Sequence, residues 1–284
     1  MSDTLRRPEG LFDAYFFDLD GTIYLGGELL PGAARTVREL RRRGIPVRFL
    51  SNNPTKDPAR YAHKLESLGL PTSPGDVVNT VVSMVRWLER EHPAATIFAI
   101  AEAPLQQALA RAGFVLSEDP AEIDVVVASY DRGFVYRKLQ IAFDALRSGR
   151  DVVLVTTNPD PYCPLPGGAA EPDAAAVVAA IEACTGVMCT KNVGKPDPDI
   201  LTAARAGIEA SIERCVMVGD RIGTDIAMAL AAGMTPGLVL TGEATEDDAR
   251  GLFAGGFPGY AMRRVDHLIP AAVWDELGWT EGEN

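Results

Sequence analysis

The sequence predicts an α/β protein: an open parallel sheet with a second α/β domain inserted into it. Short apolar runs that suit buried strands alternate with segments whose apolar residues have helical spacing. Polar clusters follow three of the strands in the outer parts of the chain, where a parallel sheet binds its ligands. The middle third repeats the alternation without such clusters. We therefore expect the two ends of the chain to form one core and the middle third to form an inserted domain.

The first part of the chain begins with an apolar run at 14–17, which predicts a buried strand. Gly44 and Gly69 each follow an amphipathic segment, as glycines do where helices end. The pattern predicts strands at 46–50 and 77–79 and helices at 31–43, 57–68 and 81–91.

The middle third predicts strands at 97–100, 125–128 and 152–155, with helices at 104–112, 136–148 and 173–184. Five prolines between 158 and 172 predict a stiff loop there. The last third predicts strands at 215–218 and 236–240, helices at 197–206 and 226–232, and a frayed acidic end.

Composition excludes some classes of function. The 284 residues are 47% hydrophobic and 23% charged, as in soluble globular proteins. The net charge of −12 argues against nucleic acid as a partner, because a phosphate backbone requires a basic face. No apolar run has signal-peptide or membrane-spanning character, and the four cysteines lack zinc-type spacing. We therefore expect a cytoplasmic protein with reduced thiols and no membrane partner.

Two aspartates, Asp18 and Asp20, follow the first strand one residue apart. Two carboxylates within a few Å repel one another unless they share a cation or a proton, so a functional pair is favoured over two solvated loop residues. Asp220 and Asp225 follow a later strand. Carboxylates on strand-end loops make the hard oxygen site that Mg²⁺ prefers.

The other polar clusters suit a phosphoryl group. Ser51 and Asn52 offer hydroxyl and amide donors, and Lys195 offers a point charge. Asp18 could attack phosphorus, while Asp20 could protonate the leaving alcohol and then deprotonate water. The pair Gly194-Lys195 is not a nucleotide-binding loop, because Pro196 stands where serine or threonine is required.

These motifs resemble, in order, the four motifs of the haloacid dehalogenase superfamily. They are Asp18-Leu19-Asp20-Gly21-Thr22, Ser51-Asn52-Asn53, Gly194-Lys195-Pro196, and the run from Gly219 to Asp225. The resemblance implies that Asp18 is the nucleophile and Asp20 the general acid/base. It also implies that Asp18, Asp220 and the backbone carbonyl of Asp20 bind Mg²⁺, with Asp225 anchoring the site from behind. Ser51, Asn52, Asn53 and Lys195 would hold the phosphoryl group. The second aspartate favours phosphate hydrolysis over dehalogenation.

The middle third resembles the α/β class II cap of the 4-nitrophenyl phosphatase, phosphoglycolate phosphatase and nucleotide monophosphatase branch. The similar segments are 130–132, 136–139 and 157–160. The resemblance implies a Rossmann-like core over 1–81 and 188–284 and a cap over 82–187. The cap would select the substrate, with Asn158, Asp160, Glu171 and Asp173 as candidate specificity residues. Glu171 and Asp173 could instead serve only at the start of the helix at 173–184.

The implied activity is a Mg²⁺-dependent phosphatase acting on a small phosphorylated metabolite: a sugar phosphate, glycerol phosphate, phosphoglycolate or nucleotide monophosphate. Phosphotransfer to a second alcohol, as in mutases, and a non-catalytic protein that binds a phosphorylated ligand are the alternatives. A homodimer is possible, since cap-mediated dimers are usual in the branch. The sequence does not identify the substrate.

Overall fold

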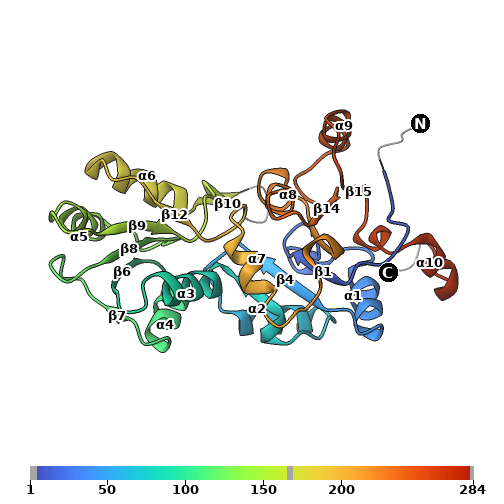
Figure 1. Cartoon of the computed structure of the whole chain (residues 1–284), viewed down its shortest axis with the longest axis horizontal. Helices are drawn as coiled ribbons and strands as arrows, with labels where there is room; N and C mark the ends of the chain where they lie inside the picture. Colours follow the sequence, from blue (N-terminus) through green and yellow to red (C-terminus); the bar gives the residue numbers. More distant parts are fainter. Residues whose placement is uncertain (1–4, 165–168, 282–284) are drawn as a thin grey trace. The chain divides into compact units, whose positions relative to one another are not determined.

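The computed structural model describes residues 5–164 and 169–281, which divide into two compact units (Figure 1). The first unit comprises Met1–Leu50, Tyr61–Val77 and Ala204–Asn284. The second comprises Ser51–Arg60 and Val78–Ala203. The second unit thus consists of the middle of the chain together with a short segment from the first third. The boundaries expected after residues 81 and 187 stay a prediction.

The first unit contains most of a six-stranded sheet with the order β15-β14-β13-β1-β4-β5. Strand β1 pairs in parallel with both β13 and β4, which confirms the parallel sheet expected from the strand–helix alternation. A small antiparallel hairpin, β2–β3, follows β1. The strands are β1 (Ala14–Asp18), β2 (Tyr24–Leu25), β3 (Glu28–Leu29), β4 (Val47–Ser51), β5 (Val77–Asn79), β13 (Cys215–Gly219), β14 (Thr235–Val239) and β15 (Tyr260–Met262).

Apolar side chains cover both faces of this sheet. On one face Tyr15 and Phe17 pack into a cluster with residues of α1, α2 and α10. Another cluster joins Leu238 to Ala249 and Phe257. The α-helices are α1 (Ala33–Arg42), α2 (Pro58–Ser67), α8 (Ala227–Ala232), α9 (Glu246–Ala254) and α10 (Ala271–Leu277). Shorter turns are η1 (Pro74–Asp76), η3 (Ile212–Arg214), the π-helix η4 (Ile222–Ile226) and η5 (Val265–Leu268).

The second unit has its own parallel sheet with the order β12-β9-β8-β6-β7. Alternate residues of β8 enter two different clusters, Val127 with residues of α3 and α4, and Val126 with residues of α5 and α6. Both faces of the central strands are therefore buried, which explains why β6, β8 and β9 are almost continuous apolar runs. The strands are β6 (Thr96–Ile100), β7 (Val115–Leu116), β8 (Val125–Ala128), β9 (Val153–Thr156) and β12 (Lys191–Asn192). The helices are α3 (Thr80–Glu91), α4 (Ala103–Arg111), α5 (Tyr136–Leu146), α6 (Ala174–Thr185) and α7 (Asp199–Ala204).

Several sequence expectations were wrong in detail. The proline-rich stretch contains an antiparallel hairpin, in which β10 (Tyr162–Pro164) pairs with β11 (Ala170–Pro172). Pro172 therefore ends a strand two residues before α6 begins. Strand β15 follows the strand expected to be the last. In the described part of the C-terminal region, Trp274 of α10 is buried and its indole donates a hydrogen bond to the Asp266 carbonyl. The acidic end that was expected to fray falls partly on residues 282–284, which lie outside the described residues.

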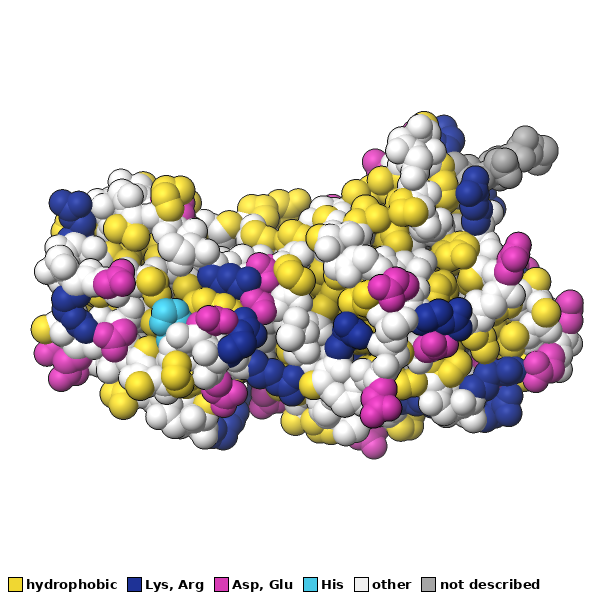
Figure 2. Space-filling view, viewed as in Figure 1, with side chains coloured by type: hydrophobic (Ala, Val, Ile, Leu, Met, Phe, Trp, Pro, Cys, Tyr) yellow, Lys and Arg dark blue, Asp and Glu magenta, His cyan; other side chains and the backbone are white. Residues whose placement is uncertain are grey.

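Charges of both signs are interspersed on the face drawn in Figure 2, despite the net charge of −12. The helices in the described part of the chain are all too short or too polar to cross a membrane.

Candidate active site

Three buried carboxylates meet at the carboxyl ends of two neighbouring strands of the first unit. Asp18 ends β1, Asp220 follows β13, and Asp225 lies in the π-helix η4. One oxygen from each carboxylate lies within 4.8 Å of the others. The three side chains are 8%, 4% and 0% exposed, respectively. The strand-end clusters of the first and last thirds of the chain therefore converge as expected.

Glycines make room for this cluster. A Cβ at Gly21 would lie 2.6 Å from Asp220 Oδ2, and one at Gly242 would lie 2.0 Å from the same oxygen. Gly219 makes room for Asp225 in the same way, because a Cβ at Gly219 would lie 2.2 Å from the carboxyl carbon of Asp225. Gly21 also has a φ of +82°, which side chains rarely adopt. The carboxylates can approach one another because these positions carry no side chain.

The donor set fits Mg²⁺, which binds to a few carboxylate oxygens and keeps several waters. Backbone N–H groups orient two of the carboxylates: Glu243 donates to Asp220 at 2.8 Å and Arg221 donates to Asp225 at 3.2 Å. Three buried carboxylates this close repel one another, and a divalent cation would offset that repulsion. Asp18 and Asp220 are the candidate side-chain ligands, and Asp225 supports the loop that carries Asp220.

Asp20 stands apart from this cluster and is exposed. The chain turns back at Gly21, whose N–H donates to the Tyr24 carbonyl at 2.8 Å. This turn places the Tyr24 hydroxyl 3.1 Å from Asp20 Oδ2, to which it donates a hydrogen bond. Burial of Tyr24, together with the nearby Asp20 carboxylate, raises the pKa of the Tyr24 hydroxyl well above its usual value. Tyr24 therefore stays protonated and acts as a donor.

The second unit holds the motif at 51–53 and Lys195. The side-chain amide of Asn52 accepts from the Lys195 N–H at 2.8 Å and donates to the Lys195 carbonyl at 3.0 Å. Its Nδ2 also donates to Asp160 Oδ2 at 2.9 Å. Both amide hydrogens of Asn52 thus have acceptors. Ser51 Oγ accepts from the Asn53 N–H, and Asn53 Oδ1 accepts from the N–H and hydroxyl of Thr55.

Three of the cap candidates join the same network. Asn158 is fully buried and donates through Nδ2 to the Asn52 carbonyl at 3.2 Å and to Asp173 Oδ1 at 3.3 Å. Its Oδ1 accepts from the Asp160 N–H. Asp173 is the N-cap of α6, and its carboxylate accepts from the Ala174 N–H at 2.6 Å. The geometry thus gives Asp173 the helix-capping role considered for it from sequence.

Glu171 lies in a separate cluster. It accepts a hydrogen bond from the hydroxyl of Tyr130, a buried residue whose pKa is raised by that burial and by Glu171. Arg132 lies over the Tyr130 ring and makes a two-point ion pair with Glu102, at 2.5 and 2.8 Å.

Sequence reasoning missed the loop after β14. Thr241 donates through its hydroxyl to the Gly21 carbonyl at 2.6 Å, Gly242 leaves space for Asp220, and Glu243 donates to Asp220. A signal was present, because this polar Thr-Gly-Glu sequence also follows a strand of the parallel sheet.

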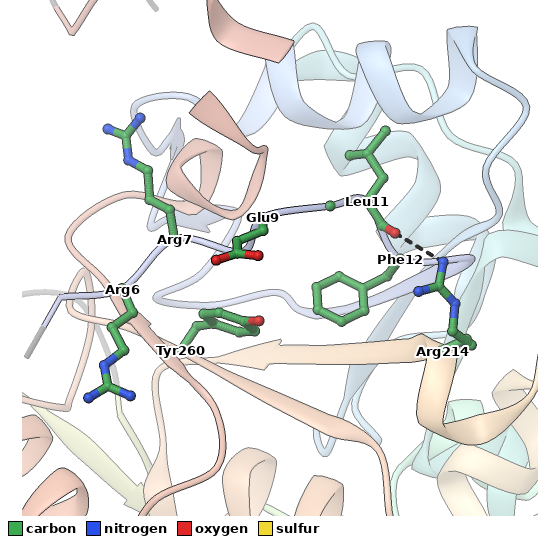
Figure 3. Close-up of a pocket in the computed structure, with 8 residues that line it drawn as sticks. Arg6, Arg7, Glu9, Leu11, Phe12, Arg214 and Tyr260 are labelled. Carbon is green, nitrogen blue, oxygen red and sulfur yellow. Dashed lines mark hydrogen bonds between the residues drawn. The ribbon is translucent and has the colours of Figure 1, made fainter. Parts of the chain in front are cut away.

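A pocket of about 490 Å³ lies elsewhere on the first unit (Figure 3). Its residues precede or open strands, so it lies at the amino ends of the sheet, away from the carboxylates. Its three guanidinium groups are already engaged. Arg6 lies over Phe253, Arg7 contacts Trp274 and Glu281, and Arg214 pairs with Asp13.

Comparison with known proteins decides the family. A family model described as Haloacid dehalogenase-like hydrolase matches residues 15–115, and a second HAD-hydrolase-like model matches residues 192–268. An acid sugar phosphatase of Staphylococcus aureus is 32% identical over 239 residues, which are 84% of this chain and 90% of that protein. The chain belongs to the haloacid dehalogenase-like hydrolases. The family expected from the four motifs is thereby confirmed.

Several solved structures have the same fold as this hydrolase. A 4-nitrophenylphosphatase from Thermotoga maritima superposes with a TM-score of 0.83 at 30% identity, covering 90% of this chain and 96% of that one. NagD from Escherichia coli K-12 superposes with a TM-score of 0.80 at 25% identity, covering 90% and 98%. The α/β fold, with a Rossmann-like core and an α/β cap, is confirmed by these likenesses.

Proposed function

We propose that this hydrolase is a Mg²⁺-dependent phosphatase that cleaves small phosphorylated metabolites through an aspartyl-phosphate. The observation that carries the proposal is the convergence of Asp18, Asp220 and Asp225, with an acid/base candidate, Asp20, two residues after Asp18. The similar proteins named as an acid sugar phosphatase and a 4-nitrophenylphosphatase support the same reaction.

Asp18, Asp220 and the Asp20 carbonyl would hold the magnesium ion, whose positive charge neutralises the carboxylates and the phosphoryl oxygens. An Asp18 oxygen forms a bond to phosphorus while the bond from phosphorus to the ester oxygen breaks. Asp20 gives its proton to the departing oxygen and later takes one from the water that cleaves the acyl phosphate. The products are the free alcohol and inorganic phosphate, and both aspartates are regenerated.

Ser51, Asn53 and Lys195 are the proposed phosphoryl-binding residues. Asn52 was expected to assist them by direct contact. Its amide hydrogens are already donated to Lys195 and Asp160, so we assign it the task of holding the Lys195 backbone. The ammonium of Lys195 suits a phosphoryl oxygen as a point charge.

We propose two domains with the bounds expected from the sequence. The core would comprise residues 1–81 and 188–284, and a cap that selects the substrate would comprise residues 82–187. Asn158, Asp160 and Glu171 stay its candidate specificity residues, whereas we assign Asp173 to the N-cap of α6. A sugar phosphate is the leading substrate class because of the acid sugar phosphatase relative. Glycerol phosphate, phosphoglycolate and nucleotide monophosphates follow. A cytoplasmic location, the lack of nucleic-acid and membrane partners, and a possible homodimer also stay predictions.

Hydrolysis of 4-nitrophenyl phosphate tests the reaction. The purified protein should turn it over with Mg²⁺ and lose turnover with excess EDTA, and Asp18→Asn should be inactive under both conditions. A panel of phosphorylated metabolites, ranked by kcat/KM, then identifies the substrate class. Ligand binding without phosphate release would overturn the proposal in favour of a binding protein. Transfer of the phosphoryl group to added alcohols in preference to water would favour a phosphotransferase.

A further inference from the structure

The residue that holds Asp20 is Tyr24. The turn between them is closed by backbone bonds from Ile23 and Tyr24 to the Leu19 carbonyl, at 2.9 and 3.2 Å. These bonds fix the Tyr24 ring relative to Asp20, and the hydroxyl donates to Asp20 Oδ2 at 3.1 Å. Asp20 is exposed whereas Tyr24 is only 1% exposed. An exposed carboxylate is thus hydrogen-bonded to a buried side chain.

A cation lies over the same ring. Lys64 Nζ of α2 is 3.4 Å from the centroid of the Tyr24 ring. A cation on the face of a phenol is attracted to the ring and draws electron density from it, which strengthens the hydroxyl as a donor. Two successive contacts therefore connect Lys64 of helix α2, through the Tyr24 ring, to the Asp20 carboxylate. All three residues belong to the first unit.

Packing alone does not explain this arrangement. The Tyr24 ring belongs to the apolar cluster under the sheet, and phenylalanine would fill the same space. The hydroxyl adds a polar atom that is costly to bury without a partner, and Asp20 supplies that partner. The tyrosine is thus suited to fix one oxygen of the carboxylate.

We infer that Tyr24 is a positioning residue for Asp20 and that Lys64 supports it through the ring. This inference rests on the proposed phosphatase function. Tyr24 donates to Oδ2, and we assign Oδ1 to carry the proton that passes to the ester oxygen as its bond to phosphorus breaks. A correctly aimed proton matters most when the departing oxygen is basic, as in an alkyl phosphate, and least for 4-nitrophenolate.

The test compares kcat/KM for glycerol phosphate and 4-nitrophenyl phosphate, because kcat/KM reports the step in which the ester bond breaks. Tyr24→Phe should lower the value for glycerol phosphate roughly 10- to 100-fold, the scale of a hydrogen bond to a charged group. The value for 4-nitrophenyl phosphate should fall only a few-fold. Equal losses on both substrates, or no loss on either, would overturn the inference.

Tyr15→Phe is the matched control. Tyr15 is also a fully buried tyrosine of the same apolar cluster, and its hydroxyl accepts from the Phe12 N–H at the start of β1. Its loss should leave the ratio of the two kcat/KM values unchanged. A shift of that ratio equal to the shift in Tyr24→Phe would also overturn the inference.

Lys64 provides a second variant on a half-buried helix position, where loss of folding is not a concern. Lys64→Met should move the ratio in the same direction as Tyr24→Phe but less, and Lys64→Arg should restore it because the cation is kept. An unmoved ratio in Lys64→Met would remove Lys64 from the inference. If the wild-type protein hydrolysed neither substrate, the proposed function itself would fail, which is a different result from any of these.

Discussion

The side chain of Asn52 closes a two-bond ring with the backbone of Lys195, at 2.8 and 3.0 Å, although the two residues are 143 positions apart. The backbone of Gly194 packs closely against the Asn52 side chain and Thr157. A Cβ added at Gly194 would be 2.8 Å from Asn52 Oδ1 and 2.5 Å from the Thr157 carbonyl oxygen. Asn52 is bonded in turn to Asp160, a cap candidate. The loop that presents Lys195 is therefore fixed by the motif at 51–53 and coupled to the cap candidates.

Asn52→Ala should lower kcat/KM roughly 10- to 100-fold, because it removes the two hydrogen bonds that hold the Lys195 backbone, each contributing about 0.5–1.5 kcal/mol. The Km and the inhibition constant of inorganic phosphate should both rise, since Lys195 is no longer held in place. Gln106→Ala is the control, since it removes a side-chain amide bonded to the Ala101 carbonyl at the start of α4. An Asn52→Ala enzyme as active as the Gln106→Ala enzyme would refute the role given to Asn52.

Asp18→Asn should lose at least ~10³-fold in turnover, the scale for removal of a covalent nucleophile. An amide can neither attack phosphorus nor carry the negative charge that attracts a divalent cation. The fold should survive, as measured by circular dichroism and thermal melting. A folded Asp18→Asn protein with near wild-type turnover would refute the mechanism.

Magnesium should raise the melting temperature of the wild-type protein at neutral pH, because it offsets repulsion among Asp18, Asp220 and Asp225. A ligand at 100 times its dissociation constant stabilises the folded state by about 2.7 kcal/mol. Gly242→Ala should abolish this rise, since the added Cβ would lie 2.0 Å from Asp220 Oδ2. Gly251→Ala in α9, where a Cβ meets nothing within 4 Å, should keep it. The same magnesium response in both variants would place the metal elsewhere.

Asp20→Asn should lower turnover by ~10²–10⁴-fold, the range for loss of general acid–base catalysis. The magnesium-dependent rise in melting temperature should change little, because the backbone carbonyl of residue 20 is retained. Rescue of turnover by excess magnesium would mean that the Asp20 side chain is itself a metal ligand.

Asp173→Ala should lower stability by about 0.5–2 kcal/mol, the cost of losing an N-cap, without changing substrate preference. Glu171→Gln should instead raise kcat/KM for phosphoglycolate relative to a neutral sugar phosphate, because it removes a charge that would repel a second carboxylate. A constant ratio between these substrates in Glu171→Gln would leave Glu171 only its contact with Tyr130.

The sequence by itself determined the parallel α/β architecture, because strand and helix periodicities are local properties of the chain. It also indicated Asp18, Asp220 and Asp225 as one cluster, since polar residues after neighbouring parallel strands meet at one edge. Only the tertiary structure decided which partners hold these residues. Gly242 against Asp220, Asn52 on Lys195, and Lys64 over Tyr24 are contacts between segments far apart in the chain. The pairing of β10 with β11 could not be predicted from the proline-rich sequence. These strands are short, and their pairing depends on the partner strand and not on an alternation of apolar and polar residues. Such contacts follow from packing in three dimensions and leave no periodic pattern in the sequence.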